Sequence, residues 1–355
     1  MQADTQRQRH LVAIFALLST AVLAACSGNA SAVAPVPRPL SAVHIFPGPA
    51  GGHIAVAQPA LSSIEYFAGI SPNSAPRGIA KGPGGTWFTQ PATNQIARIG
   101  PTGTVKEFST LPAGTNPNNI VEGVDGKLWF TEAGDRVGRI STSGGFKDFA
   151  AGNEAYGPFD IAAGGDGNLW FSFRSPSTNA IGRITTSGAV TLFTSGLTPG
   201  DPAVHDITKG PDGNIWFTEE FANKIGRITP SGVISEFSAG ISSNANLVDI
   251  TAGPDGNLWF TEYGLGKIGR ITPSGVVTEF SAGITPGTNP GAITSAEGAL
   301  WFVEVAAGRI GKISTLGNIT EYPILGTLDS DVIAGPANDL WITDFNGNGI
   351  VRVSE

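Results

Sequence analysis

The seven tryptophans of this chain recur at an almost constant interval, and this interval constrains the fold more than any other feature. They are Trp87, Trp129, Trp170, Trp216, Trp259, Trp301 and Trp341. Successive spacings are 42, 41, 46, 43, 42 and 40 residues. A repeat length of about 40 residues is typical of architectures in which each repeat is one supersecondary unit. The chain is therefore interpreted as an array of seven such units.

The clearest copy of the unit is Ile250–Ser281, which reads ITAGPDGNLWFTEYGLGKIGRITPSGVVTEFS. Short runs of β-branched and aromatic residues alternate with Asp-Gly and Ser-Gly pairs, which favour tight hairpins because glycine adopts positive φ readily. No window of the sequence has an apolar stripe at helical spacing. Four strands are predicted, at Val248–Ala252, Asn257–Glu262, Lys267–Thr272 and Val276–Ser281. Four antiparallel strands per repeat of this length are typical of a β-propeller blade.

The two ends of the repeat array complement each other. The last unit, Asp331–Ser354, stops after its third strand, IVRVS. The missing fourth strand precedes the first complete unit as Ser63–Ile70, SIEYFAGI. Pairing these two segments would close the array into a ring without exposed sheet edges. We therefore predict an all-β fold, a seven-bladed β-propeller closed by an N-terminal strand that pairs with the C-terminal blade.

Residues 1–26 have the pattern of an export signal. Arg7 and Arg9 precede the apolar run Leu11–Leu23, which is shorter than a typical membrane span. The run ends in LAAC at Cys26, which resembles the bacterial lipoprotein processing box and implies lipidation of this thiol. An ordinary signal peptide with a chance cysteine is the alternative. We expect an exported bacterial lipoprotein, anchored to a membrane by lipid alone on the periplasmic or extracellular side.

The remaining sequence divides into a tether and the propeller. Residues 27–60 are rich in Ala, Pro and Ser and are expected to form a semi-extended tether, followed by the propeller over residues 61–355. Cys26 is the only cysteine, so disulfides and Cys-based metal sites are excluded. The formal net charge is −8 and no run of Lys or Arg is present, which argues against a nucleic-acid partner. A monomer is expected.

Residues that recur in every unit are first assigned structural roles. The tryptophans are predicted to pack between blades. One basic residue recurs in the third strand of each unit and is predicted to pair with a nearby carboxylate or backbone carbonyl, although a phosphate-binding ring is conceivable. These basic residues are Arg98, Arg139, Arg183, Arg227, Arg270, Lys312 and Arg352.

The third residue after each tryptophan allows two interpretations. These residues are Gln90, Glu132, Phe173, Glu219, Glu262, Glu304 and Asp344. Their carboxylates could line an acidic mouth that holds a hard cation, with Glu219 and Glu262 as candidate metal ligands. Alternatively, each carboxylate could accept hydrogen bonds from backbone N–H groups of its neighbour, as recurrence in a structural role would suggest.

Departures from the repeat gather in units three and four. The Trp170-to-Arg183 spacing is 13 residues, against 11 in most units. The only histidine of the propeller, His205, opens unit four, and Glu220 ends the second strand of that unit. We predict that His205 and Glu220 lie on the face that carries the loops between second and third strands, as an acid–base pair. The aromatic residues predicted to bind a ligand there are Tyr156, Phe159, Phe173 and Phe221.

The segments GPDGNLWFTE and NKIGRITPSG resemble the repeats of the virginiamycin B lyase (streptogramin lyase) family along roughly Ser63–Glu355. Members are seven-bladed propellers that open a cyclic depsipeptide by elimination across its ester bond, with the help of Mg²⁺. The resemblance implies two histidines and two glutamates in the site. In the better register, His205 and Glu220 match one of each, whereas Phe159 replaces the other histidine and Ala203 the other glutamate.

Two functions follow from these observations. The resemblance implies a carbon–oxygen lyase that acts on a cyclic ester of the streptogramin B type, with Mg²⁺ as the possible cofactor. The alternative is a non-catalytic propeller at the cell surface that binds a peptide, glycan or protein with the same face. Retention of His205 and Glu220 favours the lyase, and replacement of the other two residues favours the binding protein. In either case a small cyclic ester or peptide-like ligand is expected.

Overall fold

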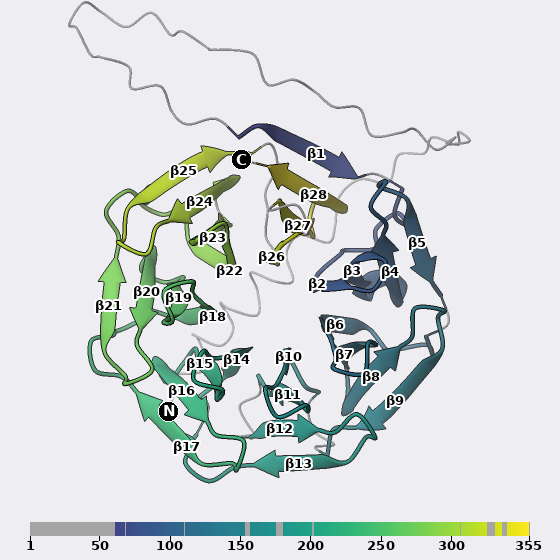
Figure 1. Cartoon of the computed structure of the whole chain (residues 1–355), viewed down its shortest axis with the longest axis horizontal. Coiled ribbons are helices and arrows are strands. Elements are labelled where there is room, and N and C mark those ends of the chain that lie inside the picture. Colours follow the sequence, from purple (N-terminus) through teal and green to yellow (C-terminus); the bar gives the residue numbers. More distant parts are fainter. Residues whose placement is uncertain are drawn as a thin grey trace, which may run out of the picture. The chain divides into compact units, whose positions relative to one another are not determined.

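The computed structural model describes residues 61–354, except 68, 110, 153–156, 175–179, 201, 306, 325–330 and 336–338. Cys26, the predicted tether and Tyr156 lie outside the described residues. Seven four-stranded antiparallel sheets are arranged as blades around one axis, which confirms the predicted seven-bladed propeller (Figure 1). No described segment forms a helix long and apolar enough to cross a membrane.

We number the blades one to seven, starting from β2. Blades one to six use their strands in chain order from the axis outward, and blade seven adds β1 as its outermost strand (Figure 1). The strands are β2 Ile79–Gly82, β3 Gly85–Gln90, β4 Gln95–Ile99, β5 Val105–Phe108; β6 Pro117–Glu122, β7 Leu128–Glu132, β8 Arg136–Ile140, β9 Phe146–Ala150; β10 Ile161–Ala163, β11 Leu169–Ser172, β12 Ile181–Ile184, β13 Val190–Phe193; β14 Val204–Lys209, β15 Ile215–Glu219, β16 Lys224–Ile228, β17 Ile234–Phe237; β18 Leu247–Ala252, β19 Leu258–Glu262, β20 Lys267–Ile271, β21 Val277–Phe280; β22 Pro290–Ala296, β23 Ala299–Glu304, β24 Arg309–Ile313, β25 Ile319–Pro323; and β26 Val332–Ala334, β27 Leu340–Asp344, β28 Gly349–Ser354. One 3₁₀ turn, Pro91–Thr93, interrupts this pattern in blade one.

The ring closes through the strand that precedes blade one. β1, Ser63–Phe67, pairs antiparallel with β28, with Ser63 opposite Ser354 and Phe67 opposite Ile350. An ion pair between Arg352 and Glu65, at 2.6 Å, joins the same two strands. The predicted closure is therefore confirmed, although the strand ends at Phe67 and not at Ile70.

Each tryptophan packs into the blade that follows it. Trp129 of blade two lies in a buried cluster with Leu169 and Phe171 of blade three. Trp341 of blade seven packs with Phe88 of blade one in the same way, so the apolar contacts continue through the closure. Burial of a tryptophan at each junction supplies a large apolar contact area, which explains why this residue marks every repeat.

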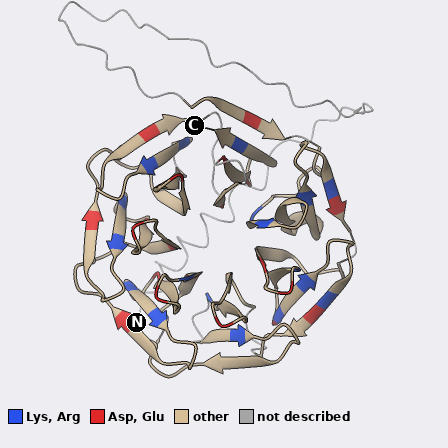
Figure 2. Ribbon diagram, viewed as in Figure 1, with Lys and Arg blue, Asp and Glu red and all other residues tan. Residues whose placement is uncertain are grey.

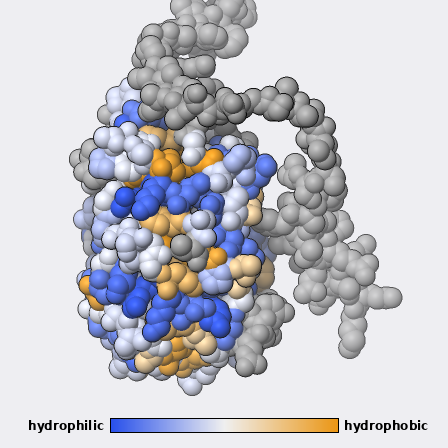
Figure 3. Space-filling view, turned by 90° about the vertical axis from the view of Figure 1, so that its right-hand side faces the viewer, coloured by the Kyte–Doolittle hydropathy of each residue, from blue (hydrophilic) through white to orange (hydrophobic). Residues whose placement is uncertain are grey.

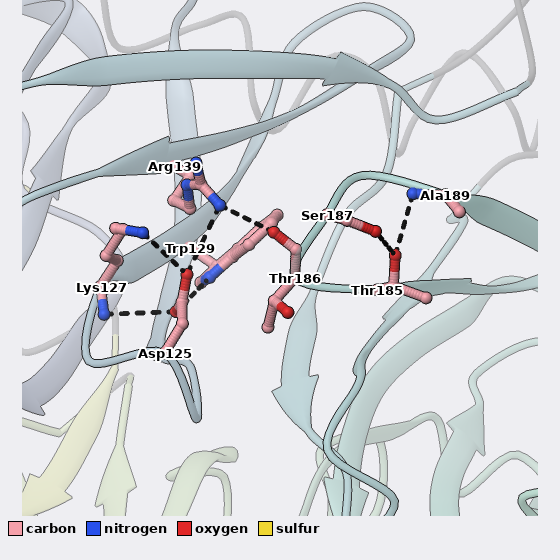
Figure 4. A network of polar contacts seen from close by, with 8 residues as sticks. All are labelled: Asp125, Lys127, Trp129, Arg139, Thr185, Thr186, Ser187 and Ala189. Atoms are coloured by element: carbon pink, nitrogen blue, oxygen red, sulfur yellow. Dashed lines mark hydrogen bonds and ion pairs between the residues drawn. The ribbon is translucent and has the colours of Figure 1, made fainter.

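The basic residue of the third strand fastens one blade to the next (Figure 4). In blade two the guanidinium of Arg139 lies over the ring of Trp129, with Cζ 5.1 Å from the ring centroid. It also donates to the backbone carbonyl of Thr186 in blade three at 2.8 Å. Asp125 accepts the indole N–H of Trp129 at 3.0 Å and lies 3.5 Å from Arg139. The predicted pairing with a carboxylate and a backbone carbonyl is confirmed.

The outer rim of the propeller has both hydrophobic and hydrophilic surface. Figure 3 views the right-hand side of the ring in Figure 1, and its hydrophobic patches are separated by hydrophilic ones. In Figure 2 acidic segments recur on the outermost strands of most blades, whereas β13 in blade three carries no charged residue. Blade three therefore differs from its neighbours in the charge of its outermost strand.

Candidate functional site

The propeller holds one equivalent backbone position at the start of each innermost strand, and different side chains occupy it. In blade four the position is His205, whose carbonyl accepts the Ser172 hydroxyl of blade three at 3.1 Å. The carbonyls of Phe159 and Val248 accept Thr131 and Thr218 hydroxyls at 2.9 Å in the same way. We call these inner-rim positions. Their described occupants with this contact are Arg77, Asn118, Phe159, His205 and Val248.

Four of the side chains that gather at this end of the axis contact one another around Phe159. The rings of Phe159 and His205 meet edge to face with centroids 4.8 Å apart. The Cζ atoms of Arg77 and Arg174 lie 5.3 and 5.5 Å from the centroid of the Phe159 ring. Together with Glu220, we call these residues the axial cluster. They come from blades one, three and four, so the packing of several blades around the axis assembles them.

Glu220 belongs to the axial cluster through its bond to an arginine. Its carboxylate Oε2 accepts from Nε of Arg174 at 2.9 Å and lies 2.8 Å from Nη2. Its backbone N–H donates to the carbonyl of Ala203, which places Glu220 opposite the start of β14 at the same end of blade four as His205. The described contacts give Glu220 the role of orienting Arg174.

His205 is neutral in this setting. The pKa of its imidazole is lowered to about 3, first by burial and then by the positive charges of Arg174 and Arg77, against a smaller opposing effect of the Val248 backbone. The side chain as a whole is half-buried, and its Nδ1 atom is buried without a hydrogen-bond partner among the described residues. The axial cluster therefore presents a neutral nitrogen base in a positive electrostatic potential.

A layer of carboxyl groups follows the inner-rim positions along the axis. Asp160, Asp206 and Asp249 each accept a backbone N–H from the next blade through Oδ2, at 2.9, 2.8 and 2.9 Å. Asp331 closes the circle by accepting from Ile79 of blade one at 3.1 Å. Burial and mutual repulsion raise the pKa of Asp206 well above its usual value. These contacts join neighbouring blades, so we assign these carboxyls a structural role.

The structure separates the aromatic residues that the sequence grouped as ligand-binding. Phe159 lies at the centre of the axial cluster, and Phe221 is 51% exposed directly after Glu220. Phe173, in contrast, is completely buried and packs against Phe171 inside blade three. Its predicted place on the ligand surface is wrong. Phe173 replaces a glutamate here and lies in one buried cluster with Ala180, which directly precedes β12, so it extends the apolar core of its blade.

The metal ligands predicted at Glu219 and Glu262 also prove to be internal. Both side chains are fully buried, each in its own blade. Burial, with a second carboxylate in strand four, raises the pKa of each to about 8. The second carboxylates, Glu236 and Glu279, accept backbone N–H groups from Thr198 and Ser242. The capping role expected for the first set therefore belongs to this second set.

Mg²⁺, which the resemblance implies, does not fit the described residues. Mg²⁺ takes octahedral oxygen ligands, mostly from carboxylates, waters and phosphates. In the axial cluster the Glu220 carboxylate is bonded to Arg174, and Arg77 adds a second positive charge beside it. Among the described residues no three His, Cys, Asp or Glu side chains are grouped so that they could hold a metal ion.

The sequence reasoning missed the two arginines. Arg77 occupies in blade one the inner-rim position that His205 occupies in blade four. Arg174 follows the second strand of blade three as Glu220 follows that of blade four. A comparison of the units position by position would have found both, because each is an arginine where the other units place a different residue.

The described propeller matches a family model whose description is the virginiamycin B lyase family, over residues 62–295 and 207–355. None of the curated protein sequences matches the chain. A solved streptogramin B lyase is 32% identical with a TM-score of 0.75, over 82% of this chain and 97% of the other. Hydrazine synthase of Kuenenia stuttgartiensis, 16% identical with a TM-score of 0.66 over 86% and 99%, shares the fold alone.

Two structures of virginiamycin B lyase from Staphylococcus aureus are also similar. The selenomethionine-substituted protein is 33% identical with a TM-score of 0.75, over 82% of this chain and 99% of the other. A catalytically inactive histidine-to-alanine variant with quinupristin is 33% identical with a TM-score of 0.76, over the same shares. That relative is therefore inactive when this one histidine is replaced by alanine.

Proposed function

The chain belongs to the virginiamycin B lyase family, and on this premise we propose that it is a carbon–oxygen lyase that opens a cyclic ester of the streptogramin B type by elimination. The observation that carries the proposal is the neutral, half-buried His205 imidazole beside the positive charges of Arg174 and Arg77. His205 is also the only histidine between residues 61 and 355. A propeller of this family with one histidine at its axis has one candidate for the base.

Elimination needs a base and a place for negative charge. The imidazole of His205 accepts the proton from the carbon beside the carbonyl, and the electrons of that C–H bond form the new C=C bond. The ester C–O bond breaks, and its electron pair leaves on the carboxylate. Arg77 and Arg174 lie beside the base and stabilise this charge. As the charge develops, it also offsets their effect on His205 and makes the imidazole a stronger base.

The proposal is tested by incubating the purified full chain with quinupristin, which accompanies the inactive relative. Liquid chromatography with mass detection separates the possible outcomes. Elimination opens the ring without a change of mass, whereas hydrolysis adds one water. A new peak of unchanged mass with an alkene absorbance is expected, and it should persist in EDTA because the residues do not fit Mg²⁺. An unaltered substrate after long incubation would contradict the proposal.

A second candidate, a non-catalytic cell-surface propeller that binds a peptide, glycan or protein, rests on Phe159 and Ala203. These residues stand where the resemblance implies a histidine and a glutamate. The two candidates are separated by binding without turnover. A binding protein would retain quinupristin or a similar cyclic peptide in equilibrium dialysis and release it chemically unchanged, whereas a lyase would release the opened ring.

Localisation provides a separate prediction for the N-terminal segment. We propose that Cys26 is lipidated and anchors the protein to a membrane, on the strength of the LAAC sequence after an apolar run. A Cys26→Ser variant should move the protein from the membrane pellet to the soluble fraction, because one lost acyl-bearing residue removes the whole anchor. Fractionation with immunoblotting measures the change. Equal membrane retention of both forms would refute lipid anchoring at this residue.

A further inference from the structure

We propose that Arg77, Phe159 and Arg174 form a binding site for a carboxylate that adjoins an aromatic or apolar group. In the reaction this site would hold the carboxylate that ester elimination releases. The inference rests on the proposed function for the place of the ligand, but binding can be measured without turnover. The binding site can therefore be tested independently of catalysis.

The geometry of the two guanidiniums supports this assignment. Arg77 and Arg174 approach Phe159 from different blades, and the Cζ atom of each lies within 5.5 Å of its ring centroid. Both arginines are exposed, whereas Phe159 is half-buried between blades. Guanidinium groups bind carboxylates through paired N–H donors, and an aromatic ring favours an apolar neighbour beside that carboxylate.

Glu220 holds Arg174 through one edge of its guanidinium, and the other edge can bind a ligand. Its two described contacts to Glu220 involve Nε and Nη2 and a single carboxylate oxygen, Oε2. An arginine carries five N–H donors, so this anchoring occupies one edge of the guanidinium. Glu220 thereby acts as a positioning residue, and the exposed ring of Phe221 beside it adds apolar surface for the rest of the ligand.

The pKa of His205 depends on the charge at this site. Its imidazole meets Phe159 edge to face at 4.8 Å, and both arginines act on it electrostatically. The charged groups that face it are Arg77 before β2, Arg174 after β11 and Glu220 after β15, with Asp160 and Asp206 one layer further along the axis. A bound anion would lower the positive potential, so protonation of His205 would become easier.

The experiment is a titration of the full chain with benzoate, and with benzamide as the uncharged ligand of the same shape. The C–H signals of His205 are followed by NMR and are identified by their loss in a His205→Gln variant. Benzoate should shift them saturably and raise the pKa of His205 by about one unit, the effect expected of one nearby charge. Benzamide should do neither. Equal effects of the two ligands would overturn the proposal.

Matched variants locate the site. Arg77→Gln and Arg174→Gln should each weaken benzoate binding at least about tenfold, because each removes a charge-assisted hydrogen bond. Lys81→Gln removes an equal charge from an exposed position on β2 and should leave binding unchanged. Loss of affinity in the Lys81 variant, or full affinity in both arginine variants, would refute the site. Benzoate binding without ester opening would instead refute only the lyase.

Discussion

His205→Ala is expected to lower the rate of quinupristin opening by about 10²–10⁴-fold, the usual contribution of a positioned general base. The half-buried imidazole is neutral at its lowered pKa and belongs to the only histidine between residues 61 and 355, so it is the candidate proton acceptor at the axis. The backbone of residue 205 is held by the Ser172 hydroxyl and does not depend on the side chain. Chromatographic rates, together with thermal unfolding of both proteins, separate lost chemistry from lost structure.

His53→Ala is a suitable control, because it removes a histidine from the segment before the propeller. It should keep the parent rate. The pH profile adds a second measurement. With a pKa of about 3, His205 is deprotonated throughout the neutral range, so kcat/KM should not fall between about pH 8 and 5 on its account. A His205→Ala variant with more than half of the parent rate would eliminate this residue as the base.

The second large effect concerns stability, at a position inside blade five. Burial and the neighbouring Glu279 raise the pKa of the Glu262 carboxyl from 4.5 to about 8. A carboxyl with a raised folded-state pKa contributes stability below its unfolded pKa and loses it as pH rises through the folded pKa. The free energy of unfolding should therefore decrease between about pH 5 and 8, by about 1 kcal/mol per pH unit for each such group.

Glu262→Gln should remove the contribution of this carboxyl to the decrease of the free energy of unfolding with rising pH. The amide keeps the shape of the protonated acid and can donate to Glu279, as Gln90 donates to Glu107 at 2.9 Å in blade one. We expect near-parental stability at pH 5 and greater stability than the parent at pH 8.5, measured by denaturant unfolding. Glu279→Gln is the contrasting variant, because it weakens the bonds to Ser242 and Lys267 at every pH. An unchanged slope in Glu262→Gln would contradict the raised pKa.

The fold could be predicted because its requirements recur. A tryptophan must fill each blade junction, and a basic residue must reach the next blade's turn, so both repeat with the blade. The four strands predicted for blade five differ from the observed ones by about one residue at their ends. The closing strand was recognisable because β1 supplies the one strand that the last unit lacks.

The site was predictable only in part, because it depends on contacts between positions far apart in the sequence. His205 and Glu220 stood out as departures from their own unit. Arg77 lies 97 residues before Arg174, and the arrangement of the blades around the axis brings both to Phe159. The misassignment of Phe173 has the same origin, since the sequence does not reveal that its glutamate counterparts are buried beside a second carboxylate.

The closure of blade seven has a consequence for the order of events during synthesis. β1 is the first strand of the propeller to be made, yet its partner β28 is the last, because Ser63 pairs with Ser354, 291 residues later. Until translation reaches β28, the nascent chain carries an unpaired β1 with no edge to join. Contacts of such long sequence separation form slowly. The pairing that completes the ring is therefore expected to form last, and a variant without β28 would leave β1 and β27 as two open sheet edges.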